Sequence, residues 1–466
     1  MPQEIELTPA AIARAVGGEL VGPEGTRKPS GFSIDTRTLV PGDVFFAIRG
    51  ARDGNAFVAD AIAKGAAAAV VSDRTLAGSQ LAGAALVVVG DALEALQALA
   101  RHVRRASGAA VVAVTGSAGK STTKEMTAEL LSSRYRVFRN KGNLNNHIGL
   151  PLSLLELRRK PDIGVLELGM NHAGEIRTLV SIAEPEVRVW TNVGPAHLEF
   201  FGTVDAIAEA KAEILEGAKT EDLLVANADD ARVMRHAARF AGRVSTFGLE
   251  RAADVQAFDV RDLGVDGTAA RVRTPVGEAD LRTGLPGTAN LSNLLAATAV
   301  ALRFDVPLSE IVARAAALKP LPRRGEMTKA GGVTIVDDSY NSNPRALSKA
   351  LSTVAGESRF ARRVALIGEM LELGQTSEAL HRSAGEEAAK SGLAALVAVG
   401  GAPARALADG AVHGGMSSSA VYYLPDSASA ADLAVTLIKS GDLVLVKGSR
   451  GIRMDVVVDR LKAELA

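Results

Sequence analysis

The sequence predicts an α/β protein with three domains: a small N-terminal α/β domain, a central parallel-sheet domain with an antiparallel extension, and a C-terminal doubly wound, Rossmann-like domain. Short apolar runs alternate with alanine-rich helical patterns along most of the 466 residues, which is typical of parallel sheets covered by helices. A glycine-bearing turn near residue 116 joins one such run to a helix. Pattern breaks at Ser107-Gly108 and in the proline-punctuated segment 318–322 divide the chain into residues 1–107, 108–318 and 319–466.

The composition is that of an ordinary globular chain, with 47% hydrophobic and 23% charged residues. The 53 basic and 53 acidic residues give a formal net charge of zero, so no global attraction to nucleic acid or to an anionic membrane is expected. The lack of cysteine excludes disulfides, thiolate metal sites and a cysteine nucleophile. No apolar run reaches the roughly 18 residues of a membrane span, and the acidic N-terminus does not resemble a signal peptide. We therefore expect a cytoplasmic protein.

The N-terminal domain alternates short apolar runs with Gly, Asp and Thr turns. Its pattern predicts a helix over residues 58–69 and buried strands at 70–71 and 86–89. A second helix, over residues 92–106, leads to the first domain boundary. The turn formed by Asp35, Thr36 and Arg37 could hold a phosphate or a sugar. The alternative is a capped turn with a surface ion pair.

The central domain begins with a phosphate-loop pattern. Residues 111–126 read VVAVTGSAGKSTTKEM, an apolar strand, a glycine-bearing turn and a helix start. Gly116 and Gly119 would let the backbone approach an anion, and the helix start adds unpaired N–H groups. Lys120 would reach the outer phosphates of a nucleotide, and the Ser121 hydroxyl would bind Mg²⁺. The alternative is an ordinary strand-to-helix turn with a surface lysine.

Polar residues follow the next strands of the predicted sheet. The segment 140–151, NKGNLNNHIGLP, holds four asparagines, which suit either hydrogen bonds to sugar, phosphate and peptide groups or a structural turn. Glu167 lies at the end of the strand 163–169, and His197 follows the strand 187–193. Because ligands of open α/β sheets bind beyond the carboxyl ends of strands, Glu167 is placed to meet a metal near the phosphates. A helix-capping acid and a structural histidine are the alternatives.

The rest of the central domain combines helices with an alternating region. An amphipathic helix is expected over residues 203–215, and its spacing alone makes Lys211 a solvated helix lysine. A core strand is expected at 223–226, and alternation over residues 243–283 predicts a short antiparallel meander. Asn290 and Asn293 lie one turn apart at the start of an alanine-rich helix, so their amides could converge on one ligand.

The third domain alternates strands and helices again. Strands are expected at 333–336, 364–367, 395–399 and 443–446, and each ends in a polar or glycine-bearing loop. Pro344 suits the first turn of a helix. Gly400-Gly401 lacks a full dinucleotide fingerprint, so a nicotinamide site is not expected.

The order of motifs resembles the Mur ligases, the ATP-dependent amide-forming enzymes of peptidoglycan synthesis. The resemblance covers nearly the whole chain and rests on TGSAGKST, NKGNLNNHIGLP, LELGMNHAGEI, TNVGPAHLEFFGT, the Lys211 helix, NLSNLLAA, RRGE, DDSYNSNP and LVKGSRG. Within the family, GNLNNHIGLP, LELGMN, DDSYNSNP and KGSRG are most similar to the ligase that adds D-alanyl-D-alanine to UDP-N-acetylmuramoyl-tripeptide. The resemblance therefore implies the last cytoplasmic step of peptidoglycan precursor synthesis.

The resemblance also implies roles for particular residues. Lys120, His197 and Lys211 would be catalytic. The nucleotide would be held by Thr115, Gly116, Ser117, Ala118, Gly119, Lys120, Ser121, Thr122, Asn290 and Arg324. Two Mg²⁺ ions would be bound by Ser121, Glu167, His197 and Lys211, the last as a carbamate. Substrate contacts would come from Asp35, Thr36 and Arg37 in a UDP-binding first domain, from Asn143, Asn145 and Asn146, and, for the dipeptide, from Asn341, Asn343, Lys447, Ser449 and Arg450.

The expected reaction transfers the ATP γ-phosphoryl group to the tripeptide carboxylate, and the dipeptide amine then attacks the acyl phosphate. The expected partners are these two peptides, without nucleic acid or membrane insertion, and the expected state is a monomer. The alternatives are a neighbouring Mur ligase that adds the third amino acid, a phosphate-loop phosphotransferase or ATPase, and a non-catalytic module that binds ATP and a UDP-sugar.

Overall fold

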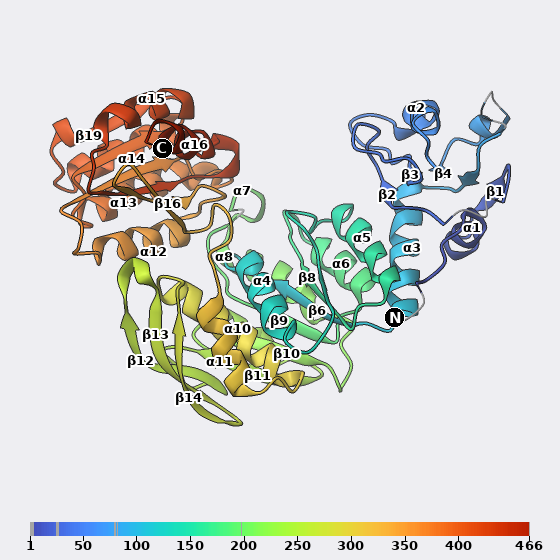
Figure 1. Cartoon of the computed structure of the whole chain (residues 1–466), viewed down its shortest axis with the longest axis horizontal. Helices are drawn as coiled ribbons and strands as arrows, with labels where there is room; N and C mark the ends of the chain where they lie inside the picture. The colour runs from blue at the N-terminus through green and yellow to red at the C-terminus, as the bar shows by residue number, and fades with distance from the viewer. Residues whose placement is uncertain (1–3, 25–27, 79–80, 82, 197, 466) are drawn as a thin grey trace.

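The computed structural model describes residues 4–24, 28–78, 81, 83–196 and 198–465. It contains three mixed α/β units, each built on its own sheet. Figure 1 shows the first and third units on opposite sides of the second. None of the helices within these described ranges has both the length and the apolar character that crossing a bilayer would require.

The first unit has a five-stranded sheet in the order β1-β5-β4-β3-β2. Only β1 runs antiparallel to its neighbour. The strands and helices are β1 Glu19–Val21, β2 Phe32–Ser33, β3 Val44–Phe46, β4 Ala68–Val71, β5 Leu86–Val88, α1 Pro9–Val16, α2 Val58–Ala63 and α3 Ala92–Ser107. The predicted helix 58–69 is too long. The chain turns at Gly65, whose φ is 88°, and Ala68 and Ala69 are buried in β4.

Helix α3 connects the first unit to the second. Asp91 caps its start by accepting hydrogen bonds from the backbone N–H groups of Leu93 and Glu94, and Gly108 ends it with a φ of 68°. Its buried residues share one apolar core with both units. The first unit is therefore fixed to the second by packing as well as by the chain.

The second unit has a nine-stranded sheet in the order β14-β13-β12-β11-β10-β9-β6-β8-β7. Its strands are β6 Ala110–Thr115, β7 Val137–Arg139, β8 Ile163–Glu167, β9 Val187–Trp190, β10 Leu223–Asn227, β11 Arg243–Gly248, β12 Val255–Asp262, β13 Thr268–Thr274 and β14 Gly277–Thr283. Its helices are α4 Lys120–Leu131, α5 Gly149–Leu154, α6 Glu175–Ala183, α7 Leu198–Phe201, α8 Val204–Ala212, α9 Ala231–Ala237, α10 Thr288–Arg303 and α11 Leu308–Ala317. The antiparallel region is shorter than predicted, because β11 pairs in parallel with β10 after the crossover helix α9.

The third unit has a six-stranded sheet in the order β15-β16-β20-β17-β18-β19. Its elements are β15 Glu326–Ala330, β16 Val333–Asp338, β17 Arg362–Gly368, β18 Ala395–Val399, β19 Val421–Leu424, β20 Asp442–Lys447, α12 Pro344–Ala355, α13 Ser377–Ala389, α14 Ala402–His413, α15 Ser427–Leu437 and α16 Asp455–Glu464. The four buried strands were predicted. The edge strands β15 and β19 were not, because they carry no fully buried apolar run.

The third unit contacts the second at the turn between β12 and β13, which lies beside α12 in Figure 1. Val265 in this turn is buried in the apolar core of the third unit. Its backbone N–H donates to Glu357 Oε2 at 3.0 Å, and Asp266 pairs with Arg359 at 2.5 Å. A second contact joins the Glu199 N–H to the Glu372 carbonyl at 3.2 Å.

Candidate active site

The phosphate-loop pattern forms a tight turn between β6 and α4. Gly116 and Gly119 have φ values of 147° and 82°. A β-carbon at residue 116 would come 2.0 Å from Thr191 Oγ1, and one at residue 119 would come 2.3 Å from Asn293 Oδ1. The turn therefore requires glycine at both positions.

The end of β9 fixes this turn from one side. The Ala118 N–H donates to Asn192 Oδ1 at 3.0 Å, and Thr191 Oγ1 donates to the Ala118 carbonyl at 2.7 Å. Helix α4 begins here without a side-chain cap among the described residues, so its first N–H groups are available to an anion. Thr191 and Asn192 were not predicted as site residues, and the glycine motif itself carries no signal for them.

Lys120 and Ser121 lie at the start of α4. Lys120 Nζ donates to the Gly116 carbonyl at 2.9 Å. Burial lowers the pKa of Lys120, and the negative charge of Glu167 partly offsets this effect. The Ser121 hydroxyl donates to Glu167 Oε2 at 2.5 Å and accepts from Arg324 Nη2 at 3.0 Å. The structure thus brings the predicted nucleotide and metal residues of two units together.

The oxygen atoms of Ser121 and Glu167 fit a hard divalent cation. Mg²⁺ prefers oxygen ligands and usually binds through one or two carboxylates together with substrate phosphates and water. The described part of the chain holds no group of three or more His, Cys, Asp or Glu side chains around a possible metal. His197, the other predicted ligand, lies outside the described residues.

Lys211 is buried on α8, with 1% of its surface exposed. The interpretation from spacing alone, a solvated helix lysine, is therefore wrong. Burial, with a contribution from the charge of Lys120, lowers the pKa of Lys211 well below its ordinary value of 10.5. Among the described residues, no hydrogen bond or ion pair of its ammonium group is found. Burial therefore favours the neutral amine over the charged ammonium at this position.

A cavity of about 800 Å³ lies between the second and third units. From the second unit it is lined by the phosphate loop, by Glu167 and by Asn143 and Asn145. From the third unit it is lined by all five residues predicted for the dipeptide: Asn341, Asn343, Lys447, Ser449 and Arg450. The phosphate loop therefore lines one wall of this cavity, and the residues predicted for the dipeptide line the opposite wall.

Several of the third-unit residues also hold local structure. Lys447 Nζ donates to Asp338 Oδ2 at 2.6 Å and to the Asn341 carbonyl at 3.0 Å. Asn343 caps α12 by accepting from the Ala346 N–H at 2.9 Å. Ser449 Oγ accepts from the Leu371 N–H at 2.9 Å. These hydrogen bonds shape the wall of the cavity.

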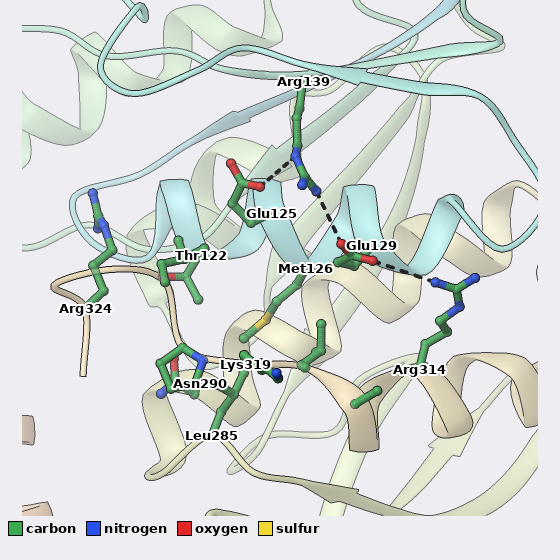
Figure 2. Close-up of a pocket in the computed structure, with 14 residues that line it drawn as sticks. Thr122, Glu125, Met126, Glu129, Arg139, Leu285, Asn290, Arg314, Lys319 and Arg324 are labelled. Atoms are coloured by element: carbon green, nitrogen blue, oxygen red, sulfur yellow. Dashed lines mark ion pairs between the residues drawn. The ribbon is translucent and has the colours of Figure 1, made fainter. Parts of the chain in front are cut away.

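A second pocket, of about 360 Å³, lies beside α4 and the segment that leads into the third unit. Figure 2 shows Thr122, Asn290 and Arg324 at one end of it. Figure 2 also shows three ion pairs along α4: Arg139 contacts Glu125 at 2.8 Å and Glu129 at 3.7 Å, and Arg314 contacts Glu129 at 3.7 Å. Asn290 Nδ2 donates to the Pro286 carbonyl at 2.8 Å. Asn290 also lines the larger cavity, where Asn293 lies too.

Arg324 is held by an aromatic ring that sequence reasoning did not single out. Its guanidinium lies 4.1 Å from the centre of the Tyr340 ring, and that of Arg450 lies 6.0 Å from it. A cation over an aromatic face is attracted by the ring quadrupole. Tyr340 therefore orients the arginine that reaches Ser121.

The remaining predicted residues lie apart from this cavity or serve local turns. Arg37 pairs with Asp35 at 2.6 Å, and its hydrogen bonds lower the pKa of Asp35 to about 2. Asp35, Thr36 and Arg37 line neither of these two pockets, and their turn carries a surface ion pair, so their role in substrate binding stays a prediction. Asn146 Oδ1 accepts from the Gly149 N–H at 2.8 Å, at the start of α5.

Comparisons with known proteins agree with this geometry. Three family models match: "Mur ligase family, catalytic domain" over residues 29–128, "Mur ligase middle domain" over 114–301 and "Mur ligase, glutamate ligase domain" over 323–450. The UDP-N-acetylmuramoyl-tripeptide--D-alanyl-D-alanine ligase of Escherichia coli K12 is 35% identical over 468 residues, which cover 98% of this chain and 99% of that protein.

Solved structures are similar over the same extent. A crystal structure of MurF from Acinetobacter baumannii superimposes with a TM-score of 0.87 at 29% identity, covering 99% of both chains. A MurF ligase from Thermotoga maritima in complex with ADP has a TM-score of 0.81 at 30% identity, covering 93% of this chain and 97% of that one. The three-domain α/β fold predicted from the sequence is confirmed.

Proposed function

This chain belongs to the Mur ligase family, and we propose that it joins D-alanyl-D-alanine to UDP-N-acetylmuramoyl-tripeptide with hydrolysis of ATP to ADP and phosphate. Relatives that carry this name align with nearly the whole chain at 32–35% identity. The observation that carries the proposal is the single cavity lined by both the phosphate loop and the third-unit residues, because the reaction must bring a nucleotide and two peptides together.

The nucleotide lies along the start of α4 in this proposal. Residues 115–122 hold its phosphates through backbone N–H groups, and Lys120 neutralises their charge. The base occupies the pocket of Figure 2, next to Asn290. Arg324 contacts the phosphates from the third unit, which its hydrogen bond to Ser121 supports. An ADP complex of a relative, the Thermotoga maritima MurF ligase, is consistent with a nucleotide site in this fold.

Ser121 and Glu167 hold Mg²⁺ beside these phosphates, as their oxygen donors permit. When bound, the ion neutralises phosphate charge and orients the transferring group. Lys211 completes the site as a carbamate. Its neutral amine can attack CO₂ and release one proton, which converts a buried lysine into an anionic oxygen donor. His197 serves a second ion in this proposal.

The chemistry overcomes the poor reactivity of a carboxylate. A tripeptide carboxylate oxygen attacks the γ-phosphorus of ATP, the bond to the ADP oxygen breaks, and an acyl phosphate forms. The dipeptide amine then attacks the acyl carbon, phosphate leaves and the amine loses a proton. Lys120 stabilises charge on the transferring group, and Asn341, Asn343, Lys447, Ser449 and Arg450 orient the dipeptide. Residues 35–37 and Asn143 and Asn146 hold the UDP-muramoyl peptide.

ADP release measured with both peptides, with each peptide alone and with neither tests the proposal. We expect ADP release to require both peptides and to match amide formation one to one. ADP release that is independent of peptides would indicate an ATPase, and phosphorylation of a hydroxyl would indicate a phosphotransferase. A panel of UDP-muramoyl peptides with single amino acids in place of D-alanyl-D-alanine separates the neighbouring ligases. Oxygen-18 in the tripeptide carboxylate should appear in the released phosphate.

A further inference from the structure

We propose that Asn145 is a positioning residue for Glu167, holding this carboxylate toward Ser121, and that it does not recognise the peptide substrate. This inference rests on the proposed function, since it assigns Glu167 to the Mg²⁺ of the nucleotide. It replaces the substrate role that the sequence predicted for Asn145.

The contacts of Asn145 point toward Glu167. Its Nδ2 donates to Glu167 Oε1 at 2.9 Å, while the other carboxylate oxygen, Oε2, accepts from Ser121 at 2.5 Å. The two oxygens are therefore held by different partners. A carboxylate with one oxygen fixed in this way cannot rotate freely, and its second oxygen stays directed at the phosphate loop.

The place of Asn145 in its loop supports this role. Residues 141–144, 146 and 147 are all exposed, whereas Asn145 is half-buried. The Gly169 N–H donates to the Asn145 carbonyl at 2.8 Å. A β-carbon on Gly169 would come 2.9 Å from the Asn145 amide group, so the amide lies directly on the chain that follows β8.

A second asparagine, Asn140, holds the backbone of Glu167. Asn140 is fully buried, and its Oδ1 accepts from the Glu167 N–H at 3.0 Å. Its Nδ2 donates to the Leu144 carbonyl at 2.8 Å, next to Asn145. The buried Lys124 donates to the Asn140 carbonyl at 2.5 Å. Helix α4, the asparagine loop and β8 are thus tied together around Glu167.

Metal binding can be measured apart from catalysis. Mn²⁺, which reports on an Mg²⁺ site, is titrated into the full chain with saturating ADP, and free Mn²⁺ is followed by electron paramagnetic resonance. We expect Asn145→Ala to weaken Mn²⁺ binding about 10- to 100-fold, the usual effect of losing a hydrogen bond to a metal ligand. The Mg²⁺ concentration for half-maximal amide formation should rise similarly, with the KM of both peptides unchanged at saturating Mg²⁺.

Two further variants make the test decisive. Gly169→Ala keeps the Asn145 side chain but displaces its amide, so it should weaken Mn²⁺ binding even if Asn145→Ala does not fold. Asn143→Ala is the matched control from the same loop, and we expect it to leave Mn²⁺ binding unchanged because no hydrogen bond joins its side chain to Glu167.

Unaltered Mn²⁺ binding together with a raised KM for the UDP-muramoyl peptide in Asn145→Ala would overturn the inference. Failure of the proposed function would instead appear as wild-type protein that makes no amide.

Discussion

At the scale of single residues, Ser121 is the point where both walls of the cavity meet. Its hydroxyl donates to Glu167 of the second unit and accepts from Arg324 of the third. Lys120 lies next to it and is half-buried, so water screens its charge only in part. Small changes at these residues should therefore have large effects on phosphoryl transfer.

Lys120→Ala and Ser121→Ala should each lower turnover at least about 100-fold, the scale of removing one charge-stabilising contact from a transition state. Steady-state ADP release with both peptides measures this effect. Circular dichroism and thermal unfolding serve as controls for folding. Rates close to those of the wild type would place the ATP site elsewhere.

Lys211→Ala should be inactive and should regain part of its activity when formate or acetate is added, because a small carboxylate can replace the carbamate. Lys120→Ala is the matched control, and carboxylates should not rescue it, since the group it loses is a cation. If Lys211→Ala is folded and no carboxylate restores ADP release, the carbamate proposal fails.

The residues of the phosphate loop could be predicted because a strand, a turn with two glycines and a helix start follow one another within a few residues of the sequence. Lys211 shows the limit of such reasoning. Its sequence neighbours Glu209 and Glu213 suggest a solvated face, yet α8 buries it, and only the family resemblance pointed to it. Asn192 and Tyr340 could not be predicted, because their roles depend on segments far apart in the chain.

At the scale of elements, a loop after β17 lines the cavity through Leu371 and Leu373. His381 on α13 holds the start of this loop through a hydrogen bond with Met370. The His381 Nε2 accepts from the Met370 N–H at 2.8 Å, and Nδ1 donates to the Ser377 carbonyl at 2.7 Å. Only the neutral ring can do both, because a protonated ring has no acceptor. Burial accordingly lowers the pKa of His381 from its ordinary value of 6.5.

His381 should make the third unit less stable in mild acid. The folded protein binds this proton less readily than the unfolded chain does, so stability is lost as the pH falls below 6.5. Thermal unfolding of the wild type and of His381→Ala between pH 8 and pH 5 measures the effect. We expect the variant to be about 1–3 kcal/mol less stable at pH 8 and the difference to narrow in acid. A difference that is constant with pH would contradict this prediction.

Elements with buried apolar runs were predicted at close to their observed places, for example β6, β8, β18 and β20. Others depend on partners that the sequence does not name. The strand β11 looks like part of a meander until its parallel pairing with β10 is known, and β15 and β19 are stabilised by one neighbour each. The helix α2 was overextended because alanine suits both a helix and a small buried strand.

At the scale of the whole molecule, the third unit is joined to the second by more than the chain. The ordering of the three sheets was predicted from alternating patterns and a proline-rich segment. The boundaries at residues 107 and 318 and the monomeric state stay predictions. The contact of Val265 with the third-unit core was not foreseeable, because Gly264 and its neighbours have the composition of any surface turn.

Glu357→Ala should loosen this contact by removing the acceptor of the Val265 N–H and one of the two carboxylate partners of Arg359. We expect a loss of about 1–3 kcal/mol and a calorimetric transition in which the third unit unfolds earlier. Asp266→Ala, which removes only an exposed partner of Arg359, is the control and should cost less than about 1 kcal/mol. A single transition unchanged in Glu357→Ala would show that the contact does not couple the units.

The contribution of Glu357 to the stability of this contact depends on pH. Hydrogen bonds from Arg359 lower the pKa of Glu357 to about 2 from its ordinary 4.5. The contribution of Glu357 is therefore complete above pH 4.5 and is lost as the pH falls toward 2. The stability difference between the wild type and Glu357→Ala, followed by chemical unfolding from pH 6 to pH 3, should shrink below pH 4.5. A difference that stays constant across this range would contradict the prediction.

The burial of Val265 in the core of the third unit also restricts how that unit can move relative to the second. A rigid body attached at two separated points, here the covalent crossing at residues 318–323 and the buried valine, keeps one degree of freedom, a swing about the line between them. The hydrogen bond from Glu199 to Glu372 lies at a third location and can form at only one angle of that swing. This hydrogen bond therefore fixes the rotation angle of the third unit. While both attachments hold, that one rotation angle describes the orientation of the third unit relative to the second.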